Sequence, residues 1–339
     1  MTNLLGHLIS LEITSPDVAA STAFYERKFG LRVVDRVGEK VYLRCWGDYY
    51  RHSVVIAPGA EPGLANMTWR TADDAALDEL ARRVEEAGVA GEWRTDEQAQ
   101  GRTYSFVGPY GHRMSLVWDV TDYQAEPGFE STYPDRPERR SSHAAAPRFL
   151  DHITIAASDV RGFAGWYSDV LGFRVMAYTD LEEAPVTVFS VLTTNEKSHD
   201  LGIVLDTSPT PGRVHHIAFW SDHPEDLIRA ADVLVENGTP IEYGPSIHGI
   251  GEQSYLYFRE PSTLRVELNS GGYRNYVPDW NPRTWVPSQG SNNFYRNWDM
   301  PDSMMEAFPA AAGLTATEDG APPAMRDALA NPWAGTKKP

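Results

Sequence analysis

Short runs of apolar and β-branched residues recur along the chain and are typical of β-strands. Two of them, residues 150–155 and 214–219, each contain histidine within a run rich in apolar and β-branched residues. A third run ends in Glu267. We predict strands over all three segments, so that His152, His216 and Glu267 stand on three separate strands.

The pattern of the first half of the chain returns in the second half. Residues 11–34 and 153–176 are both predicted to form a strand, a short amphipathic helix and a second strand. Asp17 corresponds to Asp159 at the helix start, and Gly30 corresponds to Gly172 at the helix end. A period of about 140 to 150 residues is too long for a solenoid and indicates a duplicated domain.

A second pair of similar segments follows in each copy. The segment near residue 70 resembles the one near residue 220, and Phe-Val-Gly-Pro at 106–109 resembles Phe-Arg-Glu-Pro at 258–261. The order of strand, helix and further strands therefore occurs twice within each predicted domain.

Composition divides the chain into four parts. Residues 1–122 and 148–272 hold the two copies, and residues 123–147, rich in Pro, Ser and charged groups, are predicted to be an irregular linker. Residues 273–339 begin with many Tyr, Trp, Asn and Pro residues. We expect this tail to pack on the second domain, and a position over its pocket is one arrangement open to it.

The bulk properties exclude several classes of function. The chain has 339 residues and a net charge of −17, which argues against nucleic-acid binding. No apolar run approaches the roughly 18 to 20 residues that cross a bilayer, and the N-terminus lacks a secretory signal pattern. The single cysteine, Cys45, excludes an internal disulfide. We therefore expect a cytoplasmic protein that binds neither nucleic acid nor membrane.

His152, His216 and Glu267 form a candidate metal site. Two imidazoles and one carboxylate on one face of a metal leave three coordination positions open, which is the usual way to hold non-haem Fe(II) for oxygen chemistry. Successive side chains of a strand point to opposite faces, so only one histidine of the pair at 215–216 is expected to reach the metal. We assign His216 to the metal and give His215 a structural or supporting position.

The first copy provides an internal comparison for this site. Aligning the repeated helix starts places Ser10 opposite His152, and aligning the repeated Phe-x-x-Pro segments places Ser115 opposite Glu267. The first copy therefore lacks both ligands, so they are not needed merely to build the repeated fold. This favours a function for them in the second copy.

The segment from His248 to Glu267 runs in the order His, seven residues, Leu-Tyr, two residues, Glu-Pro, five residues and Glu. This order resembles the signature of the type I extradiol catechol dioxygenases (catechol 2,3-dioxygenase-like) of the vicinal oxygen chelate superfamily. Two positions depart from it: Ser246 stands where Gly, Asn, Thr, Ile or Val is usual, and Thr263 stands where Gly or Pro is usual. The resemblance covers both copies.

The resemblance implies a fold and a set of site residues. The implied fold class is α+β, with tandem duplicated domains each built from two βαβββ modules. The implied metal is Fe(II), with Mn(II) as an alternative that the same ligand types accept. The implied site residues are His152, His216 and Glu267 as metal ligands, His199 as the acid–base residue, and His248 and Tyr257 as hydrogen-bonding groups beside the substrate hydroxyls.

The resemblance also implies a reaction. A catechol-type substrate and O2 would react so that the ring bond beside the two hydroxyls breaks and both oxygen atoms are retained, as in the degradation of aromatic compounds. The product would be of the 2-hydroxymuconic semialdehyde type. A homo-oligomer, tetramer or dimer, is implied as well.

Two alternative functions are compatible with the same fold. One is a metal-dependent isomerase or transferase of the glyoxalase type, which usually draws its ligands from paired modules. The other is a non-catalytic protein of the same fold that binds aromatic ligands.

The sequence also indicates which substituents the catechol ring carries. Residues 241–245, which lead to His248, contain no cation, and this favours a neutral catechol over one that carries a carboxylate. The tail would reverse this preference if it placed an arginine in the pocket, and the candidates are Arg274, Arg283 and Arg296.

Overall fold

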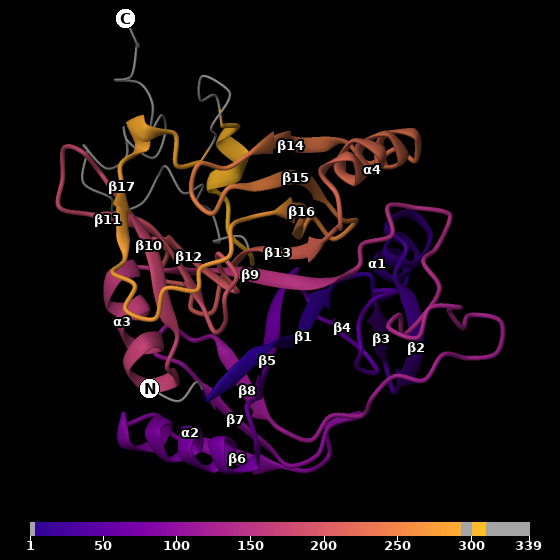
Figure 1. The fold of residues 1–339 in the computed structure, drawn as a ribbon, viewed down its shortest axis with the longest axis horizontal. Coiled ribbons are helices and arrows are strands. Elements are labelled where there is room, and N and C mark those ends of the chain that lie inside the picture. Colours follow the sequence, from indigo (N-terminus) through magenta and orange to yellow (C-terminus); the bar gives the residue numbers. More distant parts are fainter. Residues whose placement is uncertain (1–3, 293–299, 310–339) are drawn as a thin grey trace, which may run out of the picture.

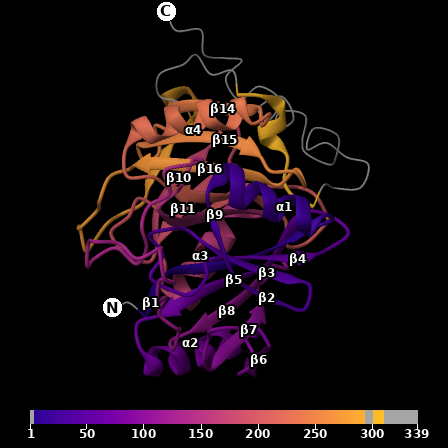
Figure 2. The ribbon, with the colours of Figure 1, turned by 90° about the vertical axis from the view of Figure 1, so that its right-hand side faces the viewer.

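The structure is a computed structural model and describes residues 4–292 and 300–309. Two mixed β-sheets form most of the molecule, one from each half of the chain (Figures 1 and 2). Each half contains the βαβββ order twice. The predicted α+β fold of tandem duplicated domains is therefore confirmed.

The elements of the two halves correspond one to one. The first half contains β1 (Leu5–Ser15), α1 (Val18–Phe24), a π-helical turn (Tyr25–Phe29), β2 (Arg32–Val37), β3 (Lys40–Arg44), β4 (Val54–Pro58), β5 (Gly63–Thr71), α2 (Asp74–Glu86), β6 (Gly91–Arg94), β7 (Thr103–Val107) and β8 (Arg113–Val117). The second half contains β9 (Phe149–Ala157), α3 (Val160–Leu171), β10 (Arg174–Asp180), β11 (Thr187–Thr193), β12 (Leu201–Leu205), β13 (Val214–Trp220), α4 (Pro224–Glu236), β14 (Ile241–Ile247), β15 (Gln253–Arg259) and β16 (Arg265–Gly271).

The two sheets share one topology. The first runs β2-β3-β4-β1-β5-β8-β7-β6, and the second repeats this order as β10-β11-β12-β9-β13-β16-β15-β14. In both sheets the first strands of the two modules lie side by side at the centre. Side chains on β9, β13 and β16 can therefore meet, because β13 lies between β9 and β16 and pairs with both.

The repeated helices begin and end at the predicted residues. Asp17 and Asp159 each accept a hydrogen bond from the backbone N–H three residues further on, at 2.9 Å, which satisfies a donor that the first helical turn leaves unpaired. Gly30 ends the π-helical turn that continues α1, and Gly172 ends α3, with φ of +92° and +78°. Glycine is favoured there because a Cβ would strain this left-handed backbone.

Aromatic side chains join the two halves. Phe29 of the π-helical turn meets Phe219 of β13 edge-on, with ring centroids 5.0 Å apart. In the other direction Trp69 of β5 meets Phe173 at 4.9 Å. All four side chains are buried, and edge-to-face pairs of this kind add to the stabilisation that burial provides. The two halves therefore share one hydrophobic core.

Residues 123–147, the predicted linker, form no helix or strand. Their path is nevertheless held by Glu138, which is buried and accepts hydrogen bonds from Arg44 Nη1 at 2.8 Å and from the Tyr123 hydroxyl at 2.6 Å. A buried carboxylate needs donors of this kind, and Arg44 is itself fully buried. This ion pair fastens the connection to the first sheet.

The described parts of the tail pack on the second sheet. β17 (Arg283–Trp285) pairs in parallel with β10, and a 3-10 turn (Asp302–Met305) precedes Phe308, which forms an antiparallel bridge with Val214. Figure 1 shows this yellow-orange part of the chain along the second half. No helix within residues 4–292 and 300–309 is long and apolar enough to cross a membrane.

Candidate metal centre and pocket

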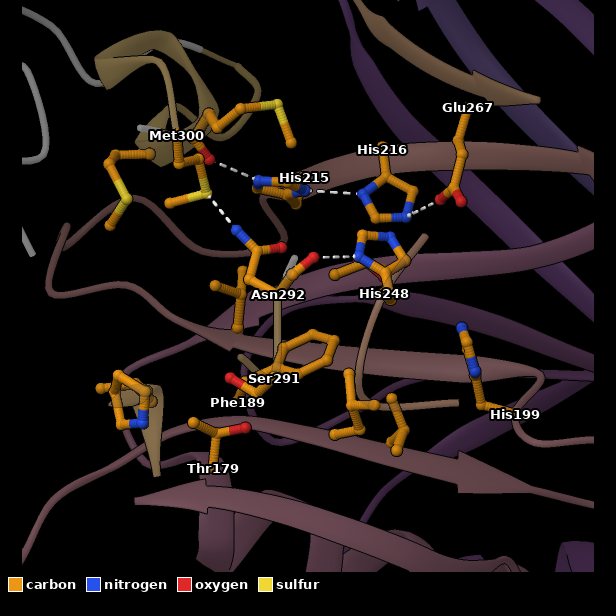
Figure 3. A pocket seen from close by; sticks show the side chains of 18 of the residues that line it. Thr179, Phe189, His199, His215, His216, His248, Glu267, Ser291, Asn292 and Met300 are labelled. Carbon is orange, nitrogen blue, oxygen red and sulfur yellow. Dashed lines mark hydrogen bonds and ion pairs between the residues drawn. The ribbon is translucent and has the colours of Figure 1, made fainter. Parts of the chain in front are cut away.

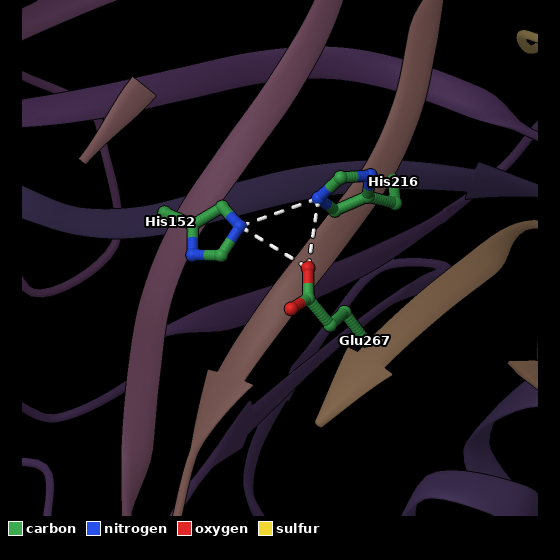
Figure 4. Close-up of side chains that lie close together, drawn as sticks. All are labelled: His152, His216 and Glu267. Carbon is green, nitrogen blue, oxygen red and sulfur yellow. Dashed lines mark hydrogen bonds and ion pairs between the residues drawn. The ribbon is translucent and has the colours of Figure 1, made fainter. Parts of the chain in front are cut away.

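The structure brings His152, His216 and Glu267 together from β9, β13 and β16 (Figure 4). Ala218 of β13 is the register partner of both His152 and Glu267, and His216 lies two residues before it on the same face. Nε2 of His152 lies 3.2 Å from Nε2 of His216, and Oε2 of Glu267 lies 3.3 and 3.0 Å from these two nitrogens. One oxygen and two nitrogens therefore point at one spot.

The chemistry of these donors fits a divalent metal ion. All three residues are at most 4 % exposed, and the Glu267 carboxylate faces the two imidazoles at 3.3 and 3.0 Å. Burial alone would raise the pKa of Glu267, but the adjacent His152 holds it well below its usual value. A buried carboxylate beside two imidazoles is the ligand set of a 2-His-1-carboxylate centre.

The same positions of the first sheet carry neutral groups. Ser10 pairs with Thr68 as His152 pairs with Ala218, and Ser115 pairs with Thr68 as Glu267 does with Ala218. Strand register thus agrees with the correspondence predicted for Ser10 and Ser115.

Asn66 takes the place of His216 in the first copy, which the sequence comparison had not identified. Its Oδ1 accepts a hydrogen bond from the Ser115 hydroxyl at 3.2 Å. In the first copy a serine hydroxyl thus donates a hydrogen bond to an amide oxygen, whereas the second copy has a carboxylate facing imidazoles at these positions.

Asp151 orients His152. The carboxylate Oδ2 lies 2.8 Å from His152 Nδ1 and accepts a hydrogen bond from Asn269 Nδ2 at 3.0 Å, while Oδ1 lies 2.8 Å from Lys197 Nζ. An imidazole that donates Nδ1–H to a carboxylate presents its Nε2 lone pair to a metal. None of these three supporting residues was predicted from the sequence, although Asp151 directly precedes His152.

His215 corrects one step of the sequence argument. Strict alternation predicts that it points away from His216, but the pairing of β13 with β9 shifts register between Val214 and His216. A register shift of this kind changes the direction of a side chain. His215 Nδ1 therefore lies 2.6 Å from His216 Nδ1, and His215 also lines the pocket.

His248 and Tyr257 form a hydrogen-bonded chain at the pocket. His248 Nδ1 lies 2.6 Å from the Asn292 carbonyl, which can only accept, so Nδ1 carries the proton and Nε2 accepts from the Tyr257 hydroxyl at 3.1 Å. Burial raises the pKa of Tyr257 well above its usual value, and the Glu267 carboxylate adds to this effect. Tyr257 is therefore a neutral hydrogen-bond donor at neutral pH.

His199 stands beside the candidate ligands. Its ring centroid lies 4.3 Å from that of His152, and its Nδ1 lies 3.2 Å from the Ser198 hydroxyl. Burial lowers the pKa of His199 well below the usual value, with His152 contributing in the same direction. The imidazole is thus neutral at neutral pH and able to accept a proton.

All six predicted site residues line one cavity of about 160 Å³. Figure 3 shows His199, His216, His248 and Glu267 at one side of it, with Phe189 and Thr179 at another. The remaining wall is largely apolar and was not predicted from the sequence. It includes Thr179, Leu181, Val188, Phe189, Val191, Ile250, Pro287, Met300, Met304 and Met305.

No arginine or lysine lines this cavity among the residues that the structure describes. Arg274 and Arg283 are exposed, and the Arg283 guanidinium lies over the Trp280 ring, 4.8 Å from its centroid. Arg296 lies outside the described residues. The described part of the tail therefore contributes uncharged residues to the pocket, namely Pro287, Ser291, Asn292, Met300, Met304 and Met305.

Sequence comparison identifies the class to which this fold and site belong. The sequence model of the glyoxalase/bleomycin resistance protein/dioxygenase superfamily matches residues 5–116 and 149–268, and the chain belongs to this family. The manganese-dependent 2,3-dihydroxybiphenyl 1,2-dioxygenase of Geobacillus genomosp. 3 is 32% identical over 83% of this chain and 89% of its own length. The metapyrocatechase of Geobacillus stearothermophilus is 29% identical over 84% of this chain and 88% of its own length.

A solved structure shares the fold. Homoprotocatechuate 2,3-dioxygenase from Arthrobacter globiformis superposes with a TM-score of 0.78, covering 90% of this chain and 92% of its own, at 24% identity. The resemblance to the extradiol dioxygenases that was inferred from the sequence is confirmed by these relatives.

Proposed function

We propose that this chain is an extradiol ring-cleaving dioxygenase that uses O2 to open a catechol-type ring. The observation that carries the proposal is the buried cluster of His152, His216 and Glu267 at the wall of an apolar cavity. The names of both curated relatives agree with it, because one is a 2,3-dihydroxybiphenyl dioxygenase and the other a metapyrocatechase. Degradation of aromatic compounds is the process such an enzyme serves.

The three clustered side chains are the proposed metal ligands. Fe(II) is the proposed ion, and Mn(II) is the alternative, since the Geobacillus genomosp. 3 relative is named as manganese-dependent. When bound, the ion supplies a Lewis acid and a redox centre that brings catechol and O2 together. Three protein ligands leave positions open for both reactants.

The surrounding side chains have proposed proton-handling and positioning roles. His199, neutral because of its burial, takes a proton from a catechol hydroxyl and later returns it, which is general acid–base catalysis. The Tyr257 hydroxyl donates its one hydrogen to His248 Nε2, which keeps Tyr257 oriented, and its oxygen can accept a hydrogen bond from a substrate hydroxyl. The apolar walls exclude water from the reacting ring.

A neutral catechol with an apolar substituent is the proposed substrate class. Phe189, Leu181 and the tail methionines offer apolar surface, and the described wall holds no cation to pair with a carboxylate. Burying an unpaired carboxylate against this wall costs several kcal/mol on an order-of-magnitude scale. Catechol, alkyl catechols and aryl catechols are therefore expected to react faster than catechols that carry a carboxylate.

A catechol panel tests the activity and the selectivity together. The Fe(II)-loaded and Mn(II)-loaded proteins are mixed aerobically with catechol, 3-methylcatechol, 2,3-dihydroxybiphenyl and 3,4-dihydroxyphenylacetate, and the yellow ring-cleavage product is followed by absorbance. Glu267→Ala should bind neither ion and give no product. Complete inactivity of both loaded forms across the panel would refute the proposal, whereas fastest turnover of the carboxylate would refute only the substrate class.

The glyoxalase-type alternative is less well supported by the distribution of the ligands. The three clustered side chains all come from the second copy, while Ser10, Asn66 and Ser115 occupy the matching positions of the first. We also propose a cytoplasmic homo-oligomer, which sedimentation and cell fractionation would test.

A further inference from the structure

His215 links the C-terminal segment to a proposed metal ligand. We use the term docked segment for residues 300–309. The Met304 carbonyl of this segment lies 2.6 Å from His215 Nε2, and His215 Nδ1 lies 2.6 Å from His216 Nδ1. His216 Nε2 in turn faces Glu267 at 3.0 Å. Figure 3 shows this line from His215 through His216 to Glu267.

The directions of these hydrogen bonds follow from the Met304 carbonyl. A carbonyl oxygen can only accept, so His215 Nε2 carries a hydrogen and donates it. The other nitrogen of a neutral imidazole has a lone pair and must accept, so His216 Nδ1 carries the hydrogen that it donates to His215. The lone pair of His216 is then on Nε2, the atom that faces the proposed metal site.

The docked segment is held so that its carbonyls are fixed in place. Arg265 Nη1 donates to the Glu306 carbonyl at 2.9 Å, and Nη2 of the same guanidinium donates to the Ser303 carbonyl. Arg213 Nη2 donates to the Ala307 carbonyl at 2.5 Å. Both arginines are at most 5 % exposed, so these bonds form away from water.

We propose that the docked segment sets the tautomer of His216 through His215, so that docking of the segment and metal binding strengthen each other. The proposal rests on the metal site of the proposed function and adds a positioning residue, His215, to it. If docking raises the metal affinity, metal binding must stabilise docking by the same factor, because coupling between two equilibria is reciprocal. The docked segment and the proposed metal ligand His216 are thereby linked.

Substitution of His215 separates this role from simple packing. His215→Phe keeps an aromatic ring of similar size but loses both hydrogen bonds, so His216 is free to turn or to place its hydrogen on Nε2. Loss of an outer partner of a ligating histidine typically weakens metal affinity by about 10- to 100-fold. His215→Gln offers an NH2 group that can donate to the Met304 carbonyl and an oxygen that can accept from His216, and should retain most of the affinity.

Two measurements on the full-length protein test the proposal. Mn(II) affinity is measured by titration with detection of free Mn(II) by electron paramagnetic resonance, which involves no turnover. Hydrogen exchange of the amides of Met304, Glu306 and Phe308, whose N–H groups bond to backbone carbonyls, is measured with and without Mn(II). In the wild type Mn(II) should slow exchange of these amides, and in His215→Phe this protection should largely disappear.

His112→Phe is the matched control. His112 Nε2 also bonds to a backbone carbonyl, that of Arg213, at 2.8 Å, and His112 is buried but does not line the pocket that holds the candidate ligands. The Arg213 carbonyl keeps a second donor, the Ala156 N–H at 3.0 Å. His112→Phe should lower the unfolding temperature without changing Mn(II) affinity.

The outcomes distinguish this proposal from the proposed function. A wild-type protein that fails to bind Mn(II) or Fe(II) would overturn the proposed function itself. Mn(II) binding that leaves exchange of the docked segment unchanged would overturn only the coupling, and this measurement needs no variant to fold. Wild-type affinity of His215→Phe, or equal losses in His215→Phe and His215→Gln, would also overturn it.

Discussion

Each ionisable side chain around the metal site takes its protonation state from its neighbours. Burial alone would lower the pKa of His152, yet the Glu267 carboxylate raises it to about 9. Burial lowers the pKa of His216 to about 4 and that of His199 well below the usual value. One histidine of the cluster thus holds a proton beside Glu267, and a metal ion would displace that proton on binding.

His199→Phe is expected to separate binding from chemistry. The variant keeps the three proposed ligands but removes the neutral imidazole, so Mn(II) and catechol affinities should stay near wild type. Ring cleavage should slow by about 10²- to 10⁴-fold, the usual contribution of a general acid–base residue. Single-turnover kinetics with anaerobically bound catechol measure the step, and the exposed His143→Phe serves as control. Unchanged turnover of His199→Phe would remove the acid–base role.

Thr263 is one of the two departures from the family signature, and its backbone conformation leads to a stability prediction. It stands where Gly or Pro is usual in the signature, and it has φ of +79° in the turn between β15 and β16, where a β-branched residue is strained. Its side chain is exposed, so little packing is lost on removal. Thr263→Gly should raise the free energy of unfolding by about 1 kcal/mol, after the entropic cost of glycine. Urea unfolding measures this, and a lower midpoint would contradict the strain argument.

The edge of the second sheet provides the surface on which the docked segment rests. Glu242 of β14 lies between Arg265 of β16, at 3.0 Å, and Arg259 of β15, at 2.7 Å. Arg259 and Arg265 also donate to the Ser303 carbonyl. Side chains from three strands therefore form one ion-pair cluster, and its arginines also donate to the backbone of the docked segment. Glu242 keeps both arginines in position.

Glu242 should make stability depend on acid pH. Burial alone would raise its pKa, but hydrogen bonds from Arg265 and Arg259 lower it from 4.5 to about 2. Its contribution, on the order of 3 kcal/mol, is present above pH 4.5 and is lost as the pH falls towards 2. Glu242→Gln should therefore be less stable than wild type at pH 7, and the difference should shrink towards pH 2. Urea unfolding at several pH values measures this, and a difference independent of pH would refute it.

At the scale of the whole molecule, regular periodicity determined what could be predicted. The repeated Asp and Gly positions defined corresponding helices, and the correspondence of Ser10 and Ser115 with His152 and Glu267 agrees with the strand register. The direction of His215 could not be predicted, because a register shift breaks the alternation of a strand without leaving a pattern in the sequence.

The distant walls of the pocket escaped prediction for a related reason. Asn292 and Met300 lie in irregular chain and Met304 lies in a short 3-10 turn, and no periodic pattern indicates which surface such a segment will contact. The supporting group Asp151 was missed because a carboxylate next to a histidine in sequence is common, and only its contacts with Lys197 and Asn269 make it distinctive.

Glu260, the acidic residue of the family signature, joins the two copies rather than the metal site. It is buried and accepts a hydrogen bond from the Ser21 hydroxyl of α1 at 2.7 Å, while the Ser15 hydroxyl lies 2.9 Å from that of Ser21. A buried carboxylate that loses a donor keeps its desolvation cost, so Ser21→Ala should lower the free energy of unfolding by about 1 to 3 kcal/mol.

The same substitution should leave the metal site intact. Ser21→Ala removes a contact between the copies and none of the contacts of His152, His216 or Glu267, so Mn(II) affinity should equal that of the wild type. Urea unfolding followed by tryptophan fluorescence, together with Mn(II) titration of the folded protein, separates the two effects. Unchanged stability would show that the hydrogen bond to Glu260 does not hold the copies together, and weakened Mn(II) binding would show that the interface reaches the metal site.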